Sequence, residues 1–195
     1  MKVLLLCALL AQDWEYRPDE GFVDKDTGAR KTPAEFLWHA VTLREGGETD
    51  DAVEAFQLIL DRAADAAIRE SAHFERAQTY LKAKRFSEAC GDFEAFLLRF
   101  PQSERATSAK RLEMVSAMEL ARAGQTKHVL GIPLYSSSKP GEDLLHDALR
   151  RYPREEFSAE FYQTLGMFFY ERAEFDSAEA EFTRVLEQYN DTPFA

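Results

Sequence analysis

Residues 76–100 read RAQTYLKAKRFSEACGDFEAFLLRF, and the spacing of their small and aromatic side chains decides the fold. Apolar residues recur every three or four positions on both sides of the polar turn at residues 81–87, which predicts two amphipathic helices joined as a hairpin. Residues 165–189 read LGMFFYERAEFDSAEAEFTRVLEQY and place small and aromatic residues at the same offsets. The sequence therefore encodes the same helix hairpin at least twice.

A third copy of this frame lies earlier in the chain, without a gap in its internal spacing. The matching positions are Ala40, Leu43, Thr49, Ala52, Phe56 and Leu60; then Ala77, Tyr80, Phe86, Ala89, Phe93 and Leu97; then Gly166, Phe169, Phe175, Ala178, Phe182 and Leu186. The small residues let the two helices of a hairpin approach, and the phenylalanines fill the space between neighbouring hairpins. The frame resembles the tetratricopeptide repeat, a helix–turn–helix unit of about 34 residues.

A degenerate hairpin separates the second and third copies. Its first helix is predicted over residues 106–123, ending at Gly124, and its second helix over residues 142–151. Between them lies an insertion at about 125–141, rich in Ser, Pro and Gly. The predicted fold class is therefore all-α: a tetratricopeptide-repeat α-solenoid of about four helix hairpins with one insertion loop, over residues 33–195.

The segment before the first hairpin, residues 13–32, is rich in Pro, Gly and Asp and is predicted to be an extended N-terminal arm. Its aromatic residues, Trp14, Tyr16 and Phe22, are expected to hold it against the first helix. Thr32 is the predicted N-cap of that helix, with Pro33 at the first helical position and Glu35 completing a capping box.

The chain starts MKVLLLCALLAQ, and residues 1–12 resemble a short signal-peptide leader. A lipid anchor on Cys7 is a weaker option, since Leu6 stands where a lipobox has a small residue. The alternative is a buried N-terminal strand or helix. Export would place the protein in the periplasm, and a lipid on Cys7 would attach it to the outer membrane. The alternative localisation is the cytoplasm.

Composition restricts the classes of partner. The chain has 35 acidic and 24 basic residues, for a formal net charge of -11. Such a surface repels phosphate backbones and anionic lipid headgroups, so no nucleic-acid partner is expected and membrane contact only through a lipid anchor. Two cysteines do not make a disulfide framework, and Cys90 is expected to be a packed helix residue.

The sequence carries no recognisable catalytic or metal-binding motif. None of the four histidines has a second ligand at metal spacing, and His39 and His73 are expected to be packing residues of first helices. A glycine-rich phosphate loop and a nucleophile elbow are also missing. The prediction is a protein that is not an enzyme and that needs neither a cofactor nor a metal.

A concave groove lined by the first helix of each hairpin is the candidate partner-binding surface of a stacked repeat protein. Its predicted side chains are apolar and aromatic with a few polar groups, which suits an extended peptide or a partner's helix. Alternatively, the insertion or the N-terminal arm covers several of them. In the repeat frame these positions are Leu37, Val41, Arg44, Phe74, Gln78, Leu81, Gln163, Met167 and Tyr170.

Three stretches resemble the BamD-like family of outer-membrane assembly lipoproteins in a divergent form. They are the arm WEYRPDEGFV, the segment HVLGIPLYSSSKPGEDLLHDALRRYP, and the last 41 residues from EEFSAEF to NDTPFA. The resemblance implies a periplasmic scaffold for the insertion of β-barrels, with a POTRA-bearing barrel-assembly protein or unfolded outer-membrane clients as partners. Two alternatives stay open: a generic periplasmic adaptor of the CpoB type, which coordinates envelope processes, and a cytoplasmic repeat adaptor.

Overall fold

The computed structural model describes residues 14–124, 127–129, 132–134, 139–152 and 157–189. The leader predicted at residues 1–12, with Cys7, lies outside the described residues, as does part of the insertion. The chain divides into two compact units, Met1–Ser103 and Glu104–Ala195. Each unit contains two helix hairpins.

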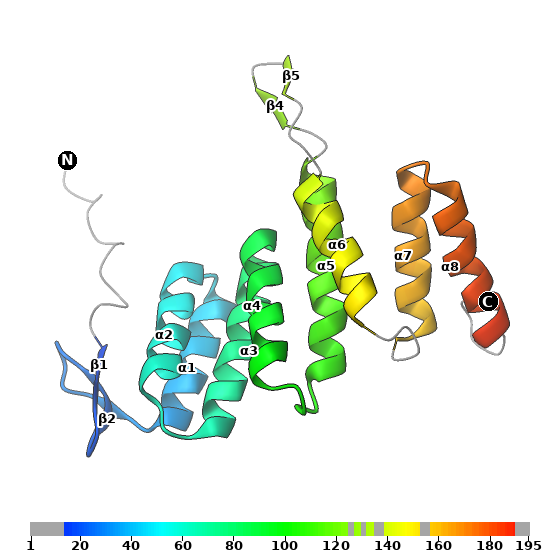
Figure 1. Ribbon diagram of the computed structural model, residues 1–195. Coiled ribbons are helices and arrows are strands. Elements are labelled where there is room, and N and C mark those ends of the chain that lie inside the picture. Colours follow the sequence, from blue (N-terminus) through cyan, green and yellow to red (C-terminus); the bar gives the residue numbers. More distant parts are fainter. Residues whose placement is uncertain (1–13, 125–126, 130–131, 135–138, 153–156, 190–195) are drawn as a thin grey trace. The chain divides into compact units, whose positions relative to one another are not determined.

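The helices of the first unit are α1 (Pro33–Gly46), α2 (Thr49–Arg62), α3 (Ala66–Lys82) and α4 (Phe86–Arg99). They form two hairpins that lie side by side in Figure 1. The predicted capping box starts α1: the Glu35 amide donates to the Thr32 hydroxyl, and the Thr32 amide donates to the Glu35 carboxylate. Asp65 caps α3 by accepting from the amides of Ala67 and Ile68.

The N-terminal arm is a small antiparallel sheet, which the sequence did not predict. Its strands are β1 (Trp14–Arg17), β2 (Gly21–Asp24) and β3 (Arg30–Lys31), in that order. The turns make it possible, because Gly21 and Gly28 take φ values of 79° and 70°, in the region that favours glycine. As expected, the arm's aromatics hold it on α1: the Phe22 ring stacks on Phe36 at 4.2 Å between centroids.

The repeat frame defines the core of the first unit. Its small residues and its central phenylalanines are all fully buried: Ala40, Ala52, Phe56, Ala77, Ala89 and Phe93. The α2–α3 junction between the two hairpins is apolar, with Phe56, Ile59, Ala63 and Ala72 in one buried cluster. The predicted burial of these positions between packed helices is confirmed.

The same type of backbone turn joins the two helices in each of three hairpins. Gly47, Lys84 and Ala173 occupy equivalent repeat positions and take φ values of 85°, 60° and 61°. In each turn two amides donate back to carbonyls of the preceding helix; at Gly47 the acceptors are Arg44 for its own amide and Leu43 for that of Glu48. This is the left-handed helix ending that favours glycine, and two of the three copies have a side chain there.

The second unit begins with the hairpin that carries the insertion. Helix α5 (Ala106–Gly124) is followed by the antiparallel strands β4 (Lys127–Val129) and β5 (Ile132–Leu134), then by α6 (Lys139–Arg151). α6 starts three residues before the position expected from the sequence, so Gly141 belongs to the helix and not to a loop. A Cβ on Gly141 would lie 2.3 Å from the Ala121 backbone nitrogen, so glycine permits the close approach of α5 and α6.

The last hairpin consists of α7 (Ala159–Glu171) and α8 (Phe175–Gln188). Ser158 caps α7, and Phe161, Leu165 and Phe168 form part of its buried face. A Cβ on Gly166 would lie 2.6 Å from the Phe182 ring, as expected for the small residue of the repeat frame. Within the described part of the chain, no helix is both long and apolar enough to cross a membrane.

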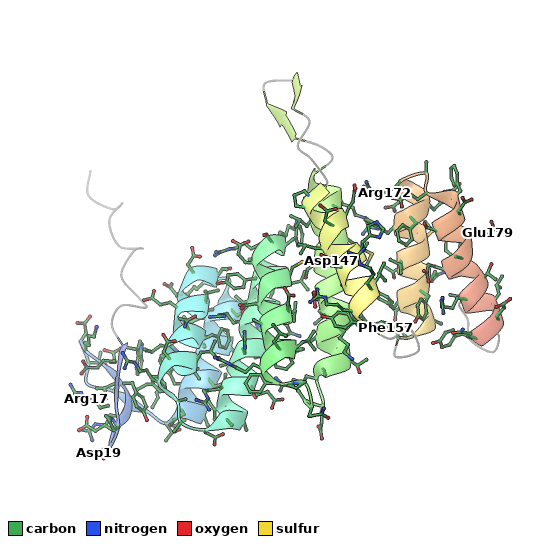
Figure 2. All side chains as sticks on the ribbon, viewed as in Figure 1. Arg17, Asp19, Asp147, Phe157, Arg172 and Glu179 are labelled. Carbon is green, nitrogen blue, oxygen red and sulfur yellow. The ribbon has the colours of Figure 1, made fainter. Side chains whose placement is uncertain are left out.

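Charged side chains form several of the contacts between the third and fourth hairpins. Arg172, near the end of α7 on the side of α6, pairs with Glu142 of α6 (Figure 2). Arg122 of α5 pairs with Glu171 of α7 at 3.1 Å. The guanidinium groups of Arg122 and Arg172 each lie 5.5 Å from the centre of the buried Phe168 ring.

Candidate functional site

The first group of predicted groove residues lies on α1 and α3 and is largely used by the fold. Leu37 and Val41 are half-buried and pack against the core of the first unit. The Arg44 side chain is only 13% exposed and forms an ion pair with Glu75 of α3. Its guanidinium also donates to the Gln78 amide oxygen at 3.4 Å. These side chains connect α1 to its neighbours more than they face solvent.

Phe74 was expected on the groove surface, and this prediction is wrong. The residue is 6% exposed, and its ring meets Phe93 and Phe96 of α4 at 5.9 and 5.4 Å between centroids. The α4 phenylalanines draw Phe74 into the hairpin because burying an aromatic ring is favourable. Leu81, the last predicted position on α3, is half-buried.

The second group, on α7, is exposed. Gln163, Met167 and Tyr170 follow one another at spacings of four and three residues, which places them on one face of the helix. Met167 is 44% exposed and Tyr170 57% exposed. The three repeat positions that are buried or half-buried on α3 are therefore open to solvent on α7.

Phe175, the first residue of α8, extends this exposed row. Its ring lies 5.7 Å from that of Tyr170 in an edge-on arrangement, and the residue is 59% exposed. We name Met167, Tyr170 and Phe175 the aromatic patch. The sequence placed Phe175 in the repeat frame but not at a site, because spacing does not tell whether a frame residue is covered.

A second surface feature, on the first unit, was also missed. A shallow hollow of about 590 Å³ lies between β3 and α1 and is lined by Arg30, Lys31, Ala34, Glu35, Trp38, His39 and Thr42. Trp38 is 72% exposed there, which is unusual for so large an apolar side chain. In the sequence, this surface could have been found from Trp38, which lies on the outward side of its predicted helix and close to the basic pair Arg30 and Lys31.

The two histidines predicted to pack do so. His39 lies against the rings of Trp14 and Phe36, and burial lowers its pKa. His73 is 4% exposed, with its ring edge-on to Phe96 and Phe100, and burial lowers its pKa to about 4. Among the described residues, no three His, Cys, Asp or Glu side chains are grouped so that they could hold a metal ion.

Comparison with known proteins agrees with the hairpin geometry. The sequence profile of the tetratricopeptide repeat family matches residues 36–66 and 71–103. The chain carries tetratricopeptide repeats. The two matches correspond to the α1–α2 and α3–α4 hairpins. The predicted fold class, an all-α tetratricopeptide-repeat solenoid, is confirmed. No curated protein matches the sequence.

Solved structures with a similar fold include MamA, residues 41 to the end, from Desulfovibrio magneticus RS-1. It is 16% identical, with a TM-score of 0.56 over 87% of this chain and 82% of that one. An RS-1 MamA double mutant, ArsTM, is 19% identical, with a TM-score of 0.49 over 82% of this chain and 76% of the other. At these identities the likeness concerns the fold of the tetratricopeptide repeats alone.

Proposed function

We propose that this chain is a non-catalytic scaffold that binds other proteins through the surface of its tetratricopeptide repeats. Helix hairpins of this type bury one face against their neighbours and present the other to solvent, where partner segments can dock. The described surface offers exposed apolar and aromatic side chains, a composition enriched in protein interfaces.

The observation that carries this proposal is the contrast between α3 and α7. On α3 Phe74 is buried and both Gln78 and Leu81 are half-buried. The equivalent positions on α7, in the same order, are Gln163, Met167 and Tyr170, and all three are solvent-exposed. Exposed aromatic side chains that contact each other cost solvation free energy in the free protein. A partner that covers these aromatic side chains would remove this free-energy cost.

Cross-linking followed by affinity capture from the native host tests the scaffold function. We expect reproducible protein partners that are lost when Tyr170 and Phe175 are both replaced by alanine, and retained in the Leu98→Ala variant. Leu98 is a matched control because it is also an exposed apolar side chain, at 79%, but lies on α4. A chain that captures no partner in any form would refute the scaffold function.

We further propose that the scaffold is BamD-like and acts in outer-membrane β-barrel assembly. The support is the resemblance of the arm, of the insertion and of the C-terminal segment to that family. Its test is co-purification with a POTRA-bearing barrel protein from membranes of the native host. Absence of that protein among the captured partners would contradict it.

Localisation separates the BamD-like proposal and the CpoB-like alternative from a cytoplasmic adaptor. We expect the tagged chain in the envelope fraction, with an intact mass that shows removal of the leader. An added mass of one diacylglyceryl group on Cys7 would show that the chain also carries a lipid anchor. Full-length protein in the cytosol would refute both periplasmic functions and leave a cytoplasmic repeat adaptor.

A further inference from the structure

The last hairpin carries much of the negative charge of the chain. Residues 157–189 contain seven acidic side chains against two arginines, a formal net charge of -5 within a total of -11. Both arginines are already paired: Arg172 with Glu142 and Glu174, and Arg184 with Glu181 at 3.4 Å. The hairpin therefore presents to solvent more carboxylates than it neutralises.

Two of these carboxylates adjoin the aromatic patch in sequence and along α8. Asp176 directly follows Phe175, and Glu179 lies one helical turn further on the same helix face as Phe175. Both are exposed. The aromatic patch is thus an apolar surface at the end of α7 with acidic groups on the α8 side.

We propose that the aromatic patch binds a cationic peptide segment of a partner protein, one in which lysines or arginines alternate with large apolar side chains. The apolar side chains pack on Met167 and on the Tyr170–Phe175 ring pair, and the cations meet Asp176 and Glu179. Cations can also lie over the exposed ring faces. The proposal rests on the scaffold function and adds the chemical class of the partner to it.

Charge complementarity favours this occupant over two others. A second copy of the chain would bring two hairpins of net charge -5 together, and the repulsion opposes such a dimer. An anionic lipid surface is repelled in the same way. A basic segment gains both from the electrostatic attraction and from covering the exposed rings.

The test uses the full chain and three fluorescein-labelled peptides in anisotropy titrations: KLFKKLFK, its acidic counterpart ELFEELFE, and the polar cationic control KSGKKSGK. We expect the first to bind at least about tenfold more tightly than either control, because both charge and apolar contact are required. Raising NaCl from about 0.05 M to about 0.5 M should weaken it several-fold, since salt screens exposed charges.

Variants locate the binding surface. Tyr170→Ala with Phe175→Ala should weaken KLFKKLFK binding about tenfold or more, and Asp176→Asn with Glu179→Gln should weaken it about threefold while reducing the salt dependence. Leu98→Ala should leave binding unchanged. Circular dichroism of each variant checks that the helices are intact, which is expected because all five side chains are exposed.

Several results would overturn the proposal: equal binding of the three peptides, no binding of KLFKKLFK, or unchanged binding in the Tyr170/Phe175 variant. Self-association that this variant abolishes, measured by analytical ultracentrifugation without peptide, would replace the cationic partner with a second copy. None of these results refutes the scaffold function, because that function fails only if cross-linking captures no partner at all.

Discussion

Two junctions between neighbouring hairpins, one in each unit, differ in the side chains that form them. The α2–α3 junction buries Phe56, Ile59 and Ala72 completely in an apolar cluster. The junction of α7 with α5 and α6 places Arg122 and Arg172 on the Phe168 ring and pairs both with carboxylates. The first should be stable and insensitive to salt, whereas the second should respond to ionic strength.

The same contrast applies to the surfaces that remain. In the first unit, Arg44 pairs with Glu75 and Phe74 is buried, so the predicted groove positions mostly serve the fold. In the last hairpin the corresponding row stays exposed and ends in the Tyr170–Phe175 ring pair. The repeated frame therefore predicts how each hairpin folds but not which of its side chains remain exposed.

The largest effect is expected from the apolar junction. Phe56→Ala should lower the free energy of unfolding by about 3–5 kcal/mol, because it leaves a cavity among fully buried side chains. Both tryptophans, Trp14 and Trp38, lie in the first unit, so urea titration followed by tryptophan fluorescence reports on it. The loss should be the same at low and high salt. A loss below about 1 kcal/mol, comparable to an exposed control such as Leu98→Ala, would show that the junction is not the core described here.

The next largest effect is a loss of stability of the first unit at low pH. Because the pKa of His73 is about 4 in the folded state and near 6.5 in the unfolded state, the unfolded chain binds more protons between these values. Stability of the first unit should therefore fall as pH drops from about 6.5 to 4, by up to about 3 kcal/mol. The neighbouring charges partly oppose each other, since Asp92 favours the imidazolium while Arg76 and Arg99 disfavour it.

His73→Leu isolates this contribution from that of the carboxylates. The difference in unfolding free energy between the variant and the natural chain should change with pH only across this window. Parallel stability curves for the two proteins from pH 7 to 4 would contradict a buried neutral imidazole.

The ionic junction gives a smaller and salt-dependent effect. Arg172→Ala should cost about 2 kcal/mol, because it leaves Glu142 without this charged donor and removes a cation from the Phe168 ring. Raising NaCl to about 0.5 M should reduce the cost. Arg150→Ala is the matched control: its side chain is 73% exposed and pairs with Asp147 on the same helix, so it should cost less than about 0.5 kcal/mol. Equal losses in the two variants, measured by circular dichroism, would argue against an ionic junction.

The smallest effects lie in the turns that join the helices of three hairpins. Gly47→Ala should destabilise by about 1 kcal/mol, because its φ of 85° is strained for a side chain. Ala173→Gly, at the equivalent turn, should stabilise by about 0.5 kcal/mol, as relief of strain outweighs the added freedom of the unfolded chain. Thermal unfolding would measure both, and changes of the same sign would show that the turns are not equivalent.

The sequence predicted what depends on local spacing. Small residues such as Ala40 and Gly166 and the frame phenylalanine Phe56 mark where helices meet, and Thr32 with Glu35 marks a helix start. Periodicity gives the direction of a side chain on its own helix but not what covers it. The burial of Phe74 depends on Phe93 and Phe96, which are about 20 residues away in the chain.

Contacts between residues far apart in the sequence also explain why the N-terminal sheet and the Arg44–Glu75 ion pair were not predicted. Three strands of two to four residues are too short for an alternating pattern to indicate a sheet, and this sheet depends on the stacking of Phe22 on Phe36. The repeat frame places Arg44 in the groove, and the ion pair of Arg44 with Glu75, 31 residues further along the chain, does not follow from that position. The exposure of Gln163, Met167 and Tyr170 on α7 agrees with their predicted positions, because none of the other helices described in the second unit covers this row of side chains.

Site-specific photo-cross-linking in the native host tests directly whether the last hairpin carries the partner-binding surface. A photoreactive phenylalanine analogue would replace Tyr170 in one strain, Leu81 in a second and Leu98 in a third. We expect a strong cross-link to a partner protein from position 170 and weak or no cross-links from the other two. Cross-links from position 81 or 98 but not from 170 would contradict the claim that the last hairpin carries the partner surface.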